Sequence, residues 1–185
     1  MSLETCRSIL VPVDFSPDSL AALKTALVLA KKLACPIIVL HVVHDPSNRP
    51  GFYHSRKAGS TVIEGMEAAA TEMMEEFLSE NDILNLVEAA GVSLSTALLR
   101  GLPVTQILHH AQTAKVDLII MGSRGRTGLS NLLIGSRAQR VVQLSPIPVM
   151  VVKAEAPDES KDWAAGEIDD ETRSDPAAET QEDLS

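Results

Sequence analysis

The sequence lacks the features that mark membrane and secreted chains. Its longest apolar runs, at 37–43 and 118–121, are far shorter than the roughly 20 residues that a membrane-spanning helix needs. Residues 1–7 carry Glu4 and Arg7 and have neither the apolar stretch nor the small-residue cleavage site of a secretory signal. We therefore expect a cytoplasmic protein that does not insert into a membrane.

Cysteine is almost absent, since only Cys6 and Cys35 occur. The two do not form a CxxC pair, and neither has a partner at the spacing of a zinc site. Neither a disulfide framework nor a structural zinc site is therefore indicated, and two ordinary reduced thiols are the better interpretation.

The net charge of −9 belongs to the C-terminal end of the chain. Residues 1–153 contain 14 basic and 13 acidic side chains, whereas residues 154–185 contain two basic and twelve acidic ones. A near-neutral body offers no broad basic face, so nucleic acid is not an expected partner. Residues 154–185 also lose all apolar periodicity and cannot bury enough surface to offset the entropy cost of ordering. We expect one domain over 1–153 and a disordered acidic tail over 154–185.

Strand-like runs alternate with helical patterns through the body of the chain. Strands are expected at 7–14, 37–43, 92–99, 117–121 and 149–153, and helices at 17–34, 64–90 with a break near 79–82, 104–115 and 136–144. Ser16 is suited to cap the first helix, with Pro17 at its first position. The polar stretch from Asp45 to about Gly59 is interpreted as a mobile loop.

This alternation predicts an α/β fold: an open five-stranded parallel sheet, doubly wound by right-handed crossovers. Ligands of such sheets bind beyond the carboxyl ends of the strands, where the strand order reverses. Ligand-binding residues are therefore expected in the loops that follow the strands.

A glycine-rich segment follows the expected fourth strand. It reads Gly122-Ser-Arg-Gly125-Arg-Thr-Gly128, and Gly135-Ser136 then opens the next helix. Glycines let a phosphate approach the backbone, and free N–H groups at a helix start attract an anion. Positive charge is concentrated in the same region, on Arg124, Arg126, Arg137 and Arg140. The segment is suited to hold a polyphosphate.

The two common nucleotide-binding fingerprints are missing, because there is no G-x-x-x-x-G-K-[ST] loop and the glycines are not spaced G-x-G-x-x-G. The pattern Gly122-x2-Gly125-x9-Gly135-Ser136 instead resembles the ATP-binding signature of universal stress proteins. The resemblance covers about residues 5–153, omits the tail, and extends to the segments Ile9–Ser16, Leu40–Val43, Arg100–Pro103 and Pro148–Lys153.

The resemblance implies a Rossmann-like fold of the adenine nucleotide alpha hydrolase-like type with a pocket for ATP. Pro12, Val13 and Asp14 would line the adenine and ribose side, with the Val42 backbone near the adenine. The triphosphate would be wrapped by Gly122, Ser123, Arg124, Gly125, Arg126, Gly135, Ser136 and Arg137. Magnesium, if it accompanies ATP, would be held by Asp14.

The edge of the sheet and the histidines carry further expectations. The last strand, Val149–Lys153, would expose an apolar edge, so we expect a homodimer, in which the resemblance implies that two such edges pair. Asp14 could instead cap the following helix, but the intact glycine signature favours the pocket. His41 and His44 would point to opposite faces of a strand and are interpreted as structural, with one of them a candidate for the pocket border.

These features favour a nucleotide-dependent regulatory module of the stress response, read by an unknown protein partner, with no catalytic residue assigned. The alternative is a weak ATP hydrolase or nucleotide-processing enzyme that uses the same pocket, for which Asp14 is the one plausible group. A protein of the same fold that binds no nucleotide is a third possibility, and the intact signature argues against it.

Overall fold

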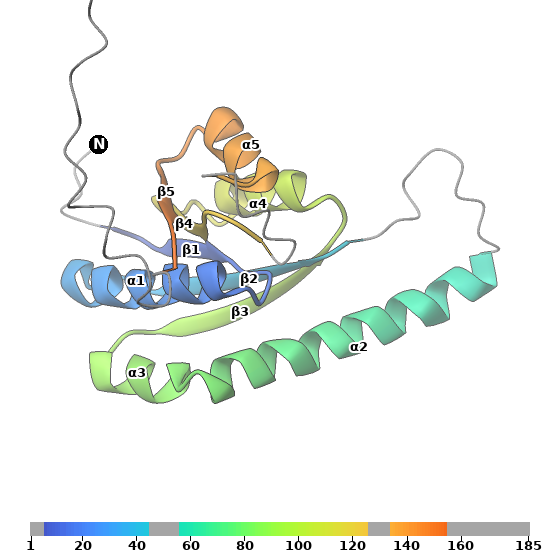
Figure 1. Ribbon diagram of the computed structural model, residues 1–185, viewed down its shortest axis with the longest axis horizontal. Coiled ribbons are helices and arrows are strands. Elements are labelled where there is room, and N and C mark those ends of the chain that lie inside the picture. The colour runs from blue at the N-terminus through green and yellow to red at the C-terminus, as the bar shows by residue number, and fades with distance from the viewer. Residues whose placement is uncertain (1–5, 45–55, 126–133, 155–185) are drawn as a thin grey trace, which may run out of the picture. The chain divides into compact units, whose positions relative to one another are not determined.

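Five strands and five helices make up the part of the chain that the computed structural model describes, residues 6–44, 56–125 and 134–154 (Figure 1). In chain order they are β1 (Ile9–Pro12), α1 (Pro17–Leu33), β2 (Ile37–Val43), α2 (Arg56–Glu80), α3 (Ile83–Ala90), β3 (Leu94–Arg100), α4 (Pro103–Thr113), β4 (Leu118–Gly122), α5 (Ser136–Leu144) and β5 (Val149–Val152). The predicted α/β alternation is confirmed.

The strands form one parallel sheet in the order β3-β2-β1-β4-β5. Ile9 of β1 lies opposite Ile37 of β2 on one side and opposite Leu118 of β4 on the other. The chain first builds outward from β1 to β3 and then returns to place β4 on the other side of β1. The predicted open, doubly wound sheet is therefore confirmed, and its strand order reverses between β1 and β4, where ligands of such folds bind.

Helices cover both faces of the sheet (Figure 1). α1, α2 and α3 pack on one face around a core that includes Ile9 and Phe77, while α4 and α5 pack on the other around Leu10 and Val141. Successive residues of β1 thus enter opposite cores, as the period of two in a strand requires. Burial on both faces explains why the central strands are almost continuously apolar.

The start of α1 follows the sequence signals. Ser16 is extended, with φ −85 and ψ 160, and its hydroxyl accepts a hydrogen bond from the N–H of Ser19 at 3.2 Å. Pro17 occupies the first turn, where its missing N–H costs nothing. This cap fixes the direction of the chain between β1 and α1.

The start of α2 differs from the prediction. The sequence indicated a helix only from Glu64, after a loop that ran to about Gly59, whereas α2 begins at Arg56. A glycine inside a helix costs only about 1 kcal/mol relative to alanine, so Gly59 does not by itself end or delay a helix. Residues 45–55 of the expected loop lie outside the described part.

The predicted break near 79–82 is confirmed, because Asp82 has a left-handed φ of 58 between α2 and α3.

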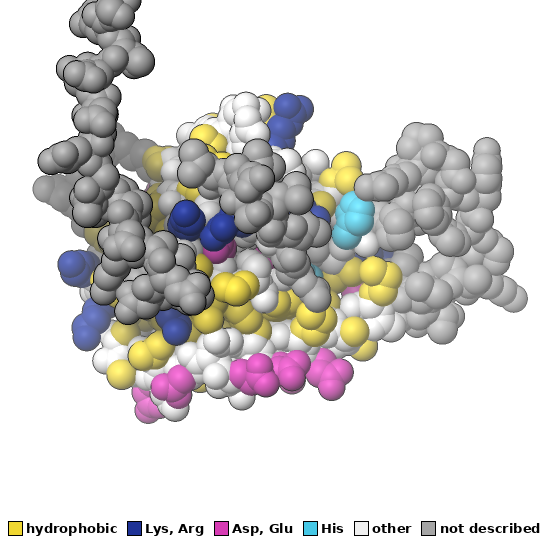
Figure 2. All heavy atoms as spheres, in the orientation of Figure 1, with side chains coloured by type: hydrophobic (Ala, Val, Ile, Leu, Met, Phe, Trp, Pro, Cys, Tyr) yellow, Lys and Arg dark blue, Asp and Glu magenta, His cyan; other side chains and the backbone are white. Residues whose placement is uncertain are grey.

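Acidic side chains form a row over α2 in Figure 2, and Glu72, Glu75, Glu76 and Glu80 of this helix are exposed. No described helix, α2 included, combines the length and the apolarity needed to cross a bilayer. Ala154 is the last described residue, so the expected tail lies beyond the structural description.

Candidate functional site

A cleft of about 410 Å³ opens beyond the carboxyl ends of β1, β2 and β4. Its volume lies within the range of about 300–1,000 Å³ that small-molecule sites occupy. Every predicted binding residue within the described ranges lines it: Pro12, Val13, Asp14, Val42, Gly122, Ser123, Arg124, Gly125, Gly135, Ser136 and Arg137. Arg126 lies outside the described residues. Segments that are far apart in the sequence thus meet at the predicted switch point.

Part of the cleft lining is apolar. Besides the predicted residues, Leu40, Pro103, Ile107 and Met121 line it, and Leu40, Ile107 and Met121 also belong to the core under α4 and α5. Sequence reasoning missed these side chains because a residue that belongs to both core and cleft has the pattern of a core residue. An apolar wall of this kind suits a flat aromatic ring.

Another part of the lining is suited to receive negative charge. α5 begins here, its N-cap Gly135 makes no side-chain cap hydrogen bond, and its first turn contains no acidic residue. The N–H groups of a first turn carry a partial positive charge that attracts anions. Arg137, in that same turn, lines the cleft and adds a full positive charge.

Close approach explains two of the signature glycines. A Cβ on Gly125 would lie 2.5 Å from the Asp14 carboxylate and 4.0 Å from the Arg137 guanidinium, and one on Gly135 would lie 3.2 Å from the Ser123 carbonyl. The glycines with positive φ in the described chain are Gly91 and Gly101. Gly125 and Gly135 are not among them, so close approach rather than positive φ is the reason for glycine at these two positions.

Gly122 has a packing role in addition to its predicted place in the site. A Cβ on Gly122 would lie 2.7 Å from the backbone carbon of Asp18 and 2.8 Å from the backbone nitrogen of Ser19. The residue lines the cleft, but it is the first turn of α1 that presses against its α-carbon. Gly122 lets α1 pack directly on the end of β4.

Asp14 lines the cleft and also stabilises the turn before α1, although the N-cap of that helix is Ser16. Its Oδ1 atom accepts a hydrogen bond from the N–H of Ser16 at 3.2 Å, which stabilises the turn before α1. The half-buried side chain also lines the cleft and faces Gly125. The turn and the cleft are therefore built on the same carboxylate.

Both His41 and His44 line the cleft, although the sequence predicted at most one of them there. β2 ends at Val43, so the alternation of a strand does not govern His44. The Nδ1 atom of His41 lies 2.8 Å from the carbonyl oxygen of Val13, and since a carbonyl only accepts, Nδ1 carries the proton. The His41 ring stacks on Phe15, with the ring centroids 4.4 Å apart.

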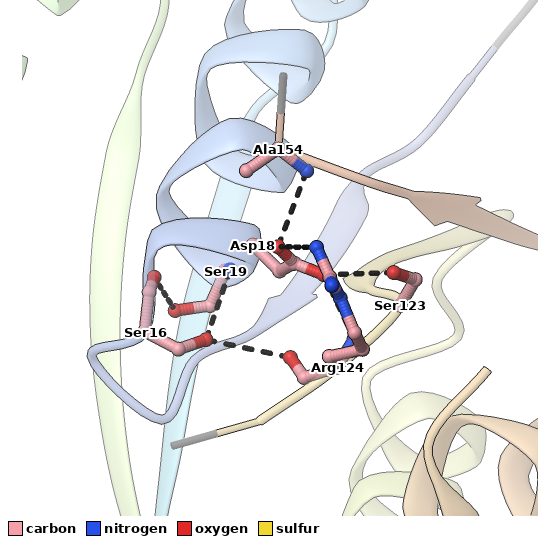
Figure 3. A network of polar contacts seen from close by, with 6 residues as sticks. All are labelled: Ser16, Asp18, Ser19, Ser123, Arg124 and Ala154. Carbon is pink, nitrogen blue, oxygen red and sulfur yellow. Dashed lines mark hydrogen bonds and ion pairs between the residues drawn. The ribbon is translucent and has the colours of Figure 1, made fainter. Parts of the chain in front are cut away.

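A polar network behind the cleft centres on the buried carboxylate of Asp18 (Figure 3). It accepts hydrogen bonds from the Ser123 hydroxyl at 2.7 Å, the Arg124 N–H at 2.9 Å and the Ala154 N–H at 3.2 Å. Burial raises the pKa of Asp18, but these hydrogen bonds and that of the Arg124 side chain outweigh it and hold the pKa below its ordinary value. Sequence reasoning missed Asp18, because an acidic residue in the first turn of a helix is ordinary.

The cysteines lie away from the cleft as free thiols. Burial, together with a hydrogen bond with Cys6, raises the pKa of Cys35 to about 12. Across 6–44, 56–125 and 134–154, no three His, Cys, Asp or Glu side chains gather as a metal-binding group.

Known proteins match this chain over its body. A model of the universal stress protein family matches residues 5–153. Universal stress protein MJ0531 of Methanocaldococcus jannaschii is 34% identical over 149 residues, which make up 80% of this chain and 82% of that relative.

Solved structures agree with the fold. Universal stress protein UspA from Lactobacillus plantarum has a TM-score of 0.67 at 26% identity and covers 80% of this chain and 98% of its own. A universal stress protein from Archaeoglobus fulgidus, solved in complex with dAMP, has a TM-score of 0.51 at 20% identity and covers 80% of this chain and 98% of its own. At that identity the second likeness shows the fold alone.

Proposed function

Since the chain belongs to the universal stress protein family, we propose that it is an ATP-binding regulatory module of the stress response, with the nucleotide in the cleft between β1 and β4. One observation carries the proposal. The cleft lining combines Asp14, Gly125, Arg137 and the uncapped start of α5 with apolar side chains. A nucleotide likewise combines an anionic part with a flat aromatic one.

We assign the adenine and the ribose to the apolar part of the cleft lining. Pro12 and Val13 would contact the base and the sugar, and the Val42 backbone would lie near the adenine. The dAMP in the Archaeoglobus fulgidus protein supports an adenine nucleotide as the ligand class for this fold.

We assign the triphosphate to the part of the lining near Arg137 and the start of α5. The groups that would hold it are Gly122, Ser123, Arg124, Gly125, Gly135, Ser136 and Arg137, together with Arg126. Asp14 is the carboxylate that would hold magnesium bound with ATP. A small cation would offset the negative charges that a triphosphate brings next to that side chain.

An unsatisfied polar atom supports a ligand in the cleft. The Nδ1 atom of His44 is buried and has no hydrogen-bond partner among the described residues. Leaving such a group unpaired costs about 1–3 kcal/mol, so buried polar atoms are normally satisfied. A ligand with a hydroxyl or ring nitrogen would supply the missing partner.

Binding rather than turnover is the proposed activity. Among the described lining residues, Asp14 is the one carboxylate, whereas phosphoryl transfer usually needs a positioned base or water-orienting group and firmly held metal. The alternative of slow ATP hydrolysis by the same pocket is tested by a single-turnover assay with excess protein. Release of phosphate with a rate constant that falls when Asp14 is replaced would favour the enzyme.

Two further expectations belong to the proposal. We propose that residues 1–153 are the domain and that it forms a homodimer through the edge formed by β5, where Met150 is 38% exposed. A dimer would cover that apolar edge and would give a protein partner a surface that could depend on the nucleotide.

Equilibrium dialysis of the full chain against ATP tests the proposal. We expect saturable binding that excess GTP displaces only weakly. Absence of saturable binding, with and without magnesium, would contradict the proposed function.

A further inference from the structure

We propose that Asp18 is a positioning residue for the nucleotide site and makes the geometry of that site depend on Ala154, the second residue after β5. The inference rests on the proposed nucleotide binding. It concerns a side chain that does not line the cleft but lies behind it.

The first step is the contact with the loop after β4. The Asp18 carboxylate accepts from the Ser123 hydroxyl at 2.7 Å and from the Arg124 N–H at 2.9 Å, both on Oδ2. Ser123, Arg124 and Gly125 line the cleft on the other side of this loop. Charge-assisted hydrogen bonds of this length are roughly twice as strong as neutral ones, so they fix where the loop begins.

The Arg124 guanidinium belongs to the same arrangement. Its Nε lies 3.3 Å from Oδ2 of Asp18 and its Nη2 3.5 Å from Oδ1, and the side chain runs toward Asp18 in Figure 3. This guanidinium offsets the charge of a carboxylate that is only 5% exposed. Arg124 would therefore contact a ligand through its backbone, because its guanidinium is bound to the Asp18 carboxylate.

The second step is the contact with the end of the sheet. The N–H of Ala154 donates to Oδ1 of Asp18 at 3.2 Å, and the N–H of Ser123 donates to the carbonyl of Val152 at 2.7 Å. Ala154, two residues after the end of β5, and the loop after β4 thus share one buried carboxylate. Buried networks are worth most when every member is satisfied, so loss of the Ala154 donor would weaken the hold on the loop.

Packing prevents α1 from moving to compensate. The backbone of Asp18 lies so close to Gly122 that an added Cβ would be 2.7 Å from it. The carboxylate therefore stays at a fixed place relative to β4, and only its hydrogen-bond partners can change. Displacement of Ala154 would therefore change the hydrogen bonds that Ser123 and Arg124 donate to Asp18.

Asp117 provides a matched control for the test. Its carboxylate also binds an arginine side chain and a backbone N–H, both from Arg7 and each at 2.6 Å, and its pKa is also lowered. Asp117 precedes β4, at the amino end of that strand and away from the cleft. Asp117→Asn therefore removes a more exposed ion pair between a carboxylate and an arginine without touching the site.

The experiment measures ATP affinity by calorimetry and the amide spectrum by ¹⁵N NMR, in the full chain, for Asp18→Asn and Asp117→Asn. By comparison with residues that orient ligating groups, we expect Asp18→Asn to weaken ATP binding by about tenfold or more. It should also shift the Arg124, Gly125 and Ser136 amide signals of the nucleotide-free protein. Asp117→Asn should leave affinity and these signals unchanged.

A second pair of variants tests the link to Ala154 without altering Asp18. Ala154→Pro removes the N–H donor, whereas Ala154→Gly keeps it. We expect the proline variant to weaken ATP binding and shift the Arg124 amide signal, and the glycine variant to match the wild type. This pair decides the question if Asp18→Asn does not fold.

The outcomes separate this inference from the proposed function. If the wild type binds ATP and both Asp18→Asn and Ala154→Pro bind it equally well, Asp18 is structural only and the inference is wrong. If the wild type binds no ATP, the proposed function fails, and unchanged amide signals in Ala154→Pro would overturn the positioning role independently.

Discussion

The carboxylate of Asp14 occupies the space beside Gly125 that any side chain at that position would need. A Cβ there would lie 2.5 Å from the Asp14 Oδ2 atom, closer than carbon and oxygen can approach without displacement. The residues after β1 and the loop after β4 therefore lie in close contact where residue 125 has no side chain. The relationship joins the two halves of the fold at the proposed phosphate end of the cleft.

Gly122→Ala should destabilise the protein more than it affects chemistry in the cleft. The added methyl would lie 2.7 Å from the backbone carbon of Asp18, and backbone cannot move aside as a flexible side chain can. Overpacking of this kind costs about 1–3 kcal/mol. Urea denaturation measures the loss, and the matched variant Gly65→Ala, with no atom within 4 Å of its added methyl, should show none. Equal stability of the two variants would contradict the packing described at Gly122.

Acid should weaken the fold through Asp18 and Asp117. Hydrogen bonds to each hold its folded-state pKa below the ordinary value of 3.8. Their stabilisation is complete above that value and is lost as the pH falls through the lower folded-state pKa, because the unfolded chain takes up the protons first. Urea denaturation at a series of pH values should show this fall, and Asp117→Asn should reduce it. An unchanged acid dependence in Asp117→Asn would count against the role of the Arg7 contact.

The fold could be predicted further than the site, and the reasons are local. The Ser16 cap, the apolar strands and the Gly135-Ser136 helix start are signalled by neighbouring residues, and each is found in the structure. The sequence placed the start of α2 too late because residues 56–60, Arg-Lys-Ala-Gly-Ser, show no apolar periodicity.

Contacts across the sheet explain what sequence reasoning missed at the site. Asp18 joins Ser123 and Ala154, which lie more than a hundred positions away, and no local pattern reports such a contact. His44 enters the cleft because β2 ends one residue before it. The reason for glycine at position 125 likewise depends on Asp14, a residue of another strand end.

A chain that ends at Ala154 should keep the melting temperature and ATP affinity of the full protein. The described core and cleft end there, and Ala154 retains the N–H that binds Asp18. Thermal denaturation and calorimetry of the shortened and full chains provide the comparison. A fall of many degrees in melting temperature would show that residues 155–185 dock on the domain.

The protein should be a dimer in solution at micromolar concentration. β5 is an edge strand of the sheet, and an apolar edge favours pairing with a second copy. Light scattering gives the mass directly, and Met150→Lys, which places a charge on a side chain that is 38% exposed at this edge, should shift it toward a monomer. A monomeric wild type would rule out the proposed interface.

Calorimetric titration of ATP into the wild type, Gly125→Val and Gly135→Val tests the central claim most directly. We predict saturable binding to the wild type, none to Gly125→Val, and loss or strong weakening in Gly135→Val, whose added Cβ would lie 3.2 Å from the Ser123 carbonyl. Circular dichroism should show both variants folded, since a cost of about 1–3 kcal/mol is within what such a domain tolerates. Wild-type affinity in both valine variants would show that the glycine segment is only a turn and that the cleft does not hold ATP as proposed.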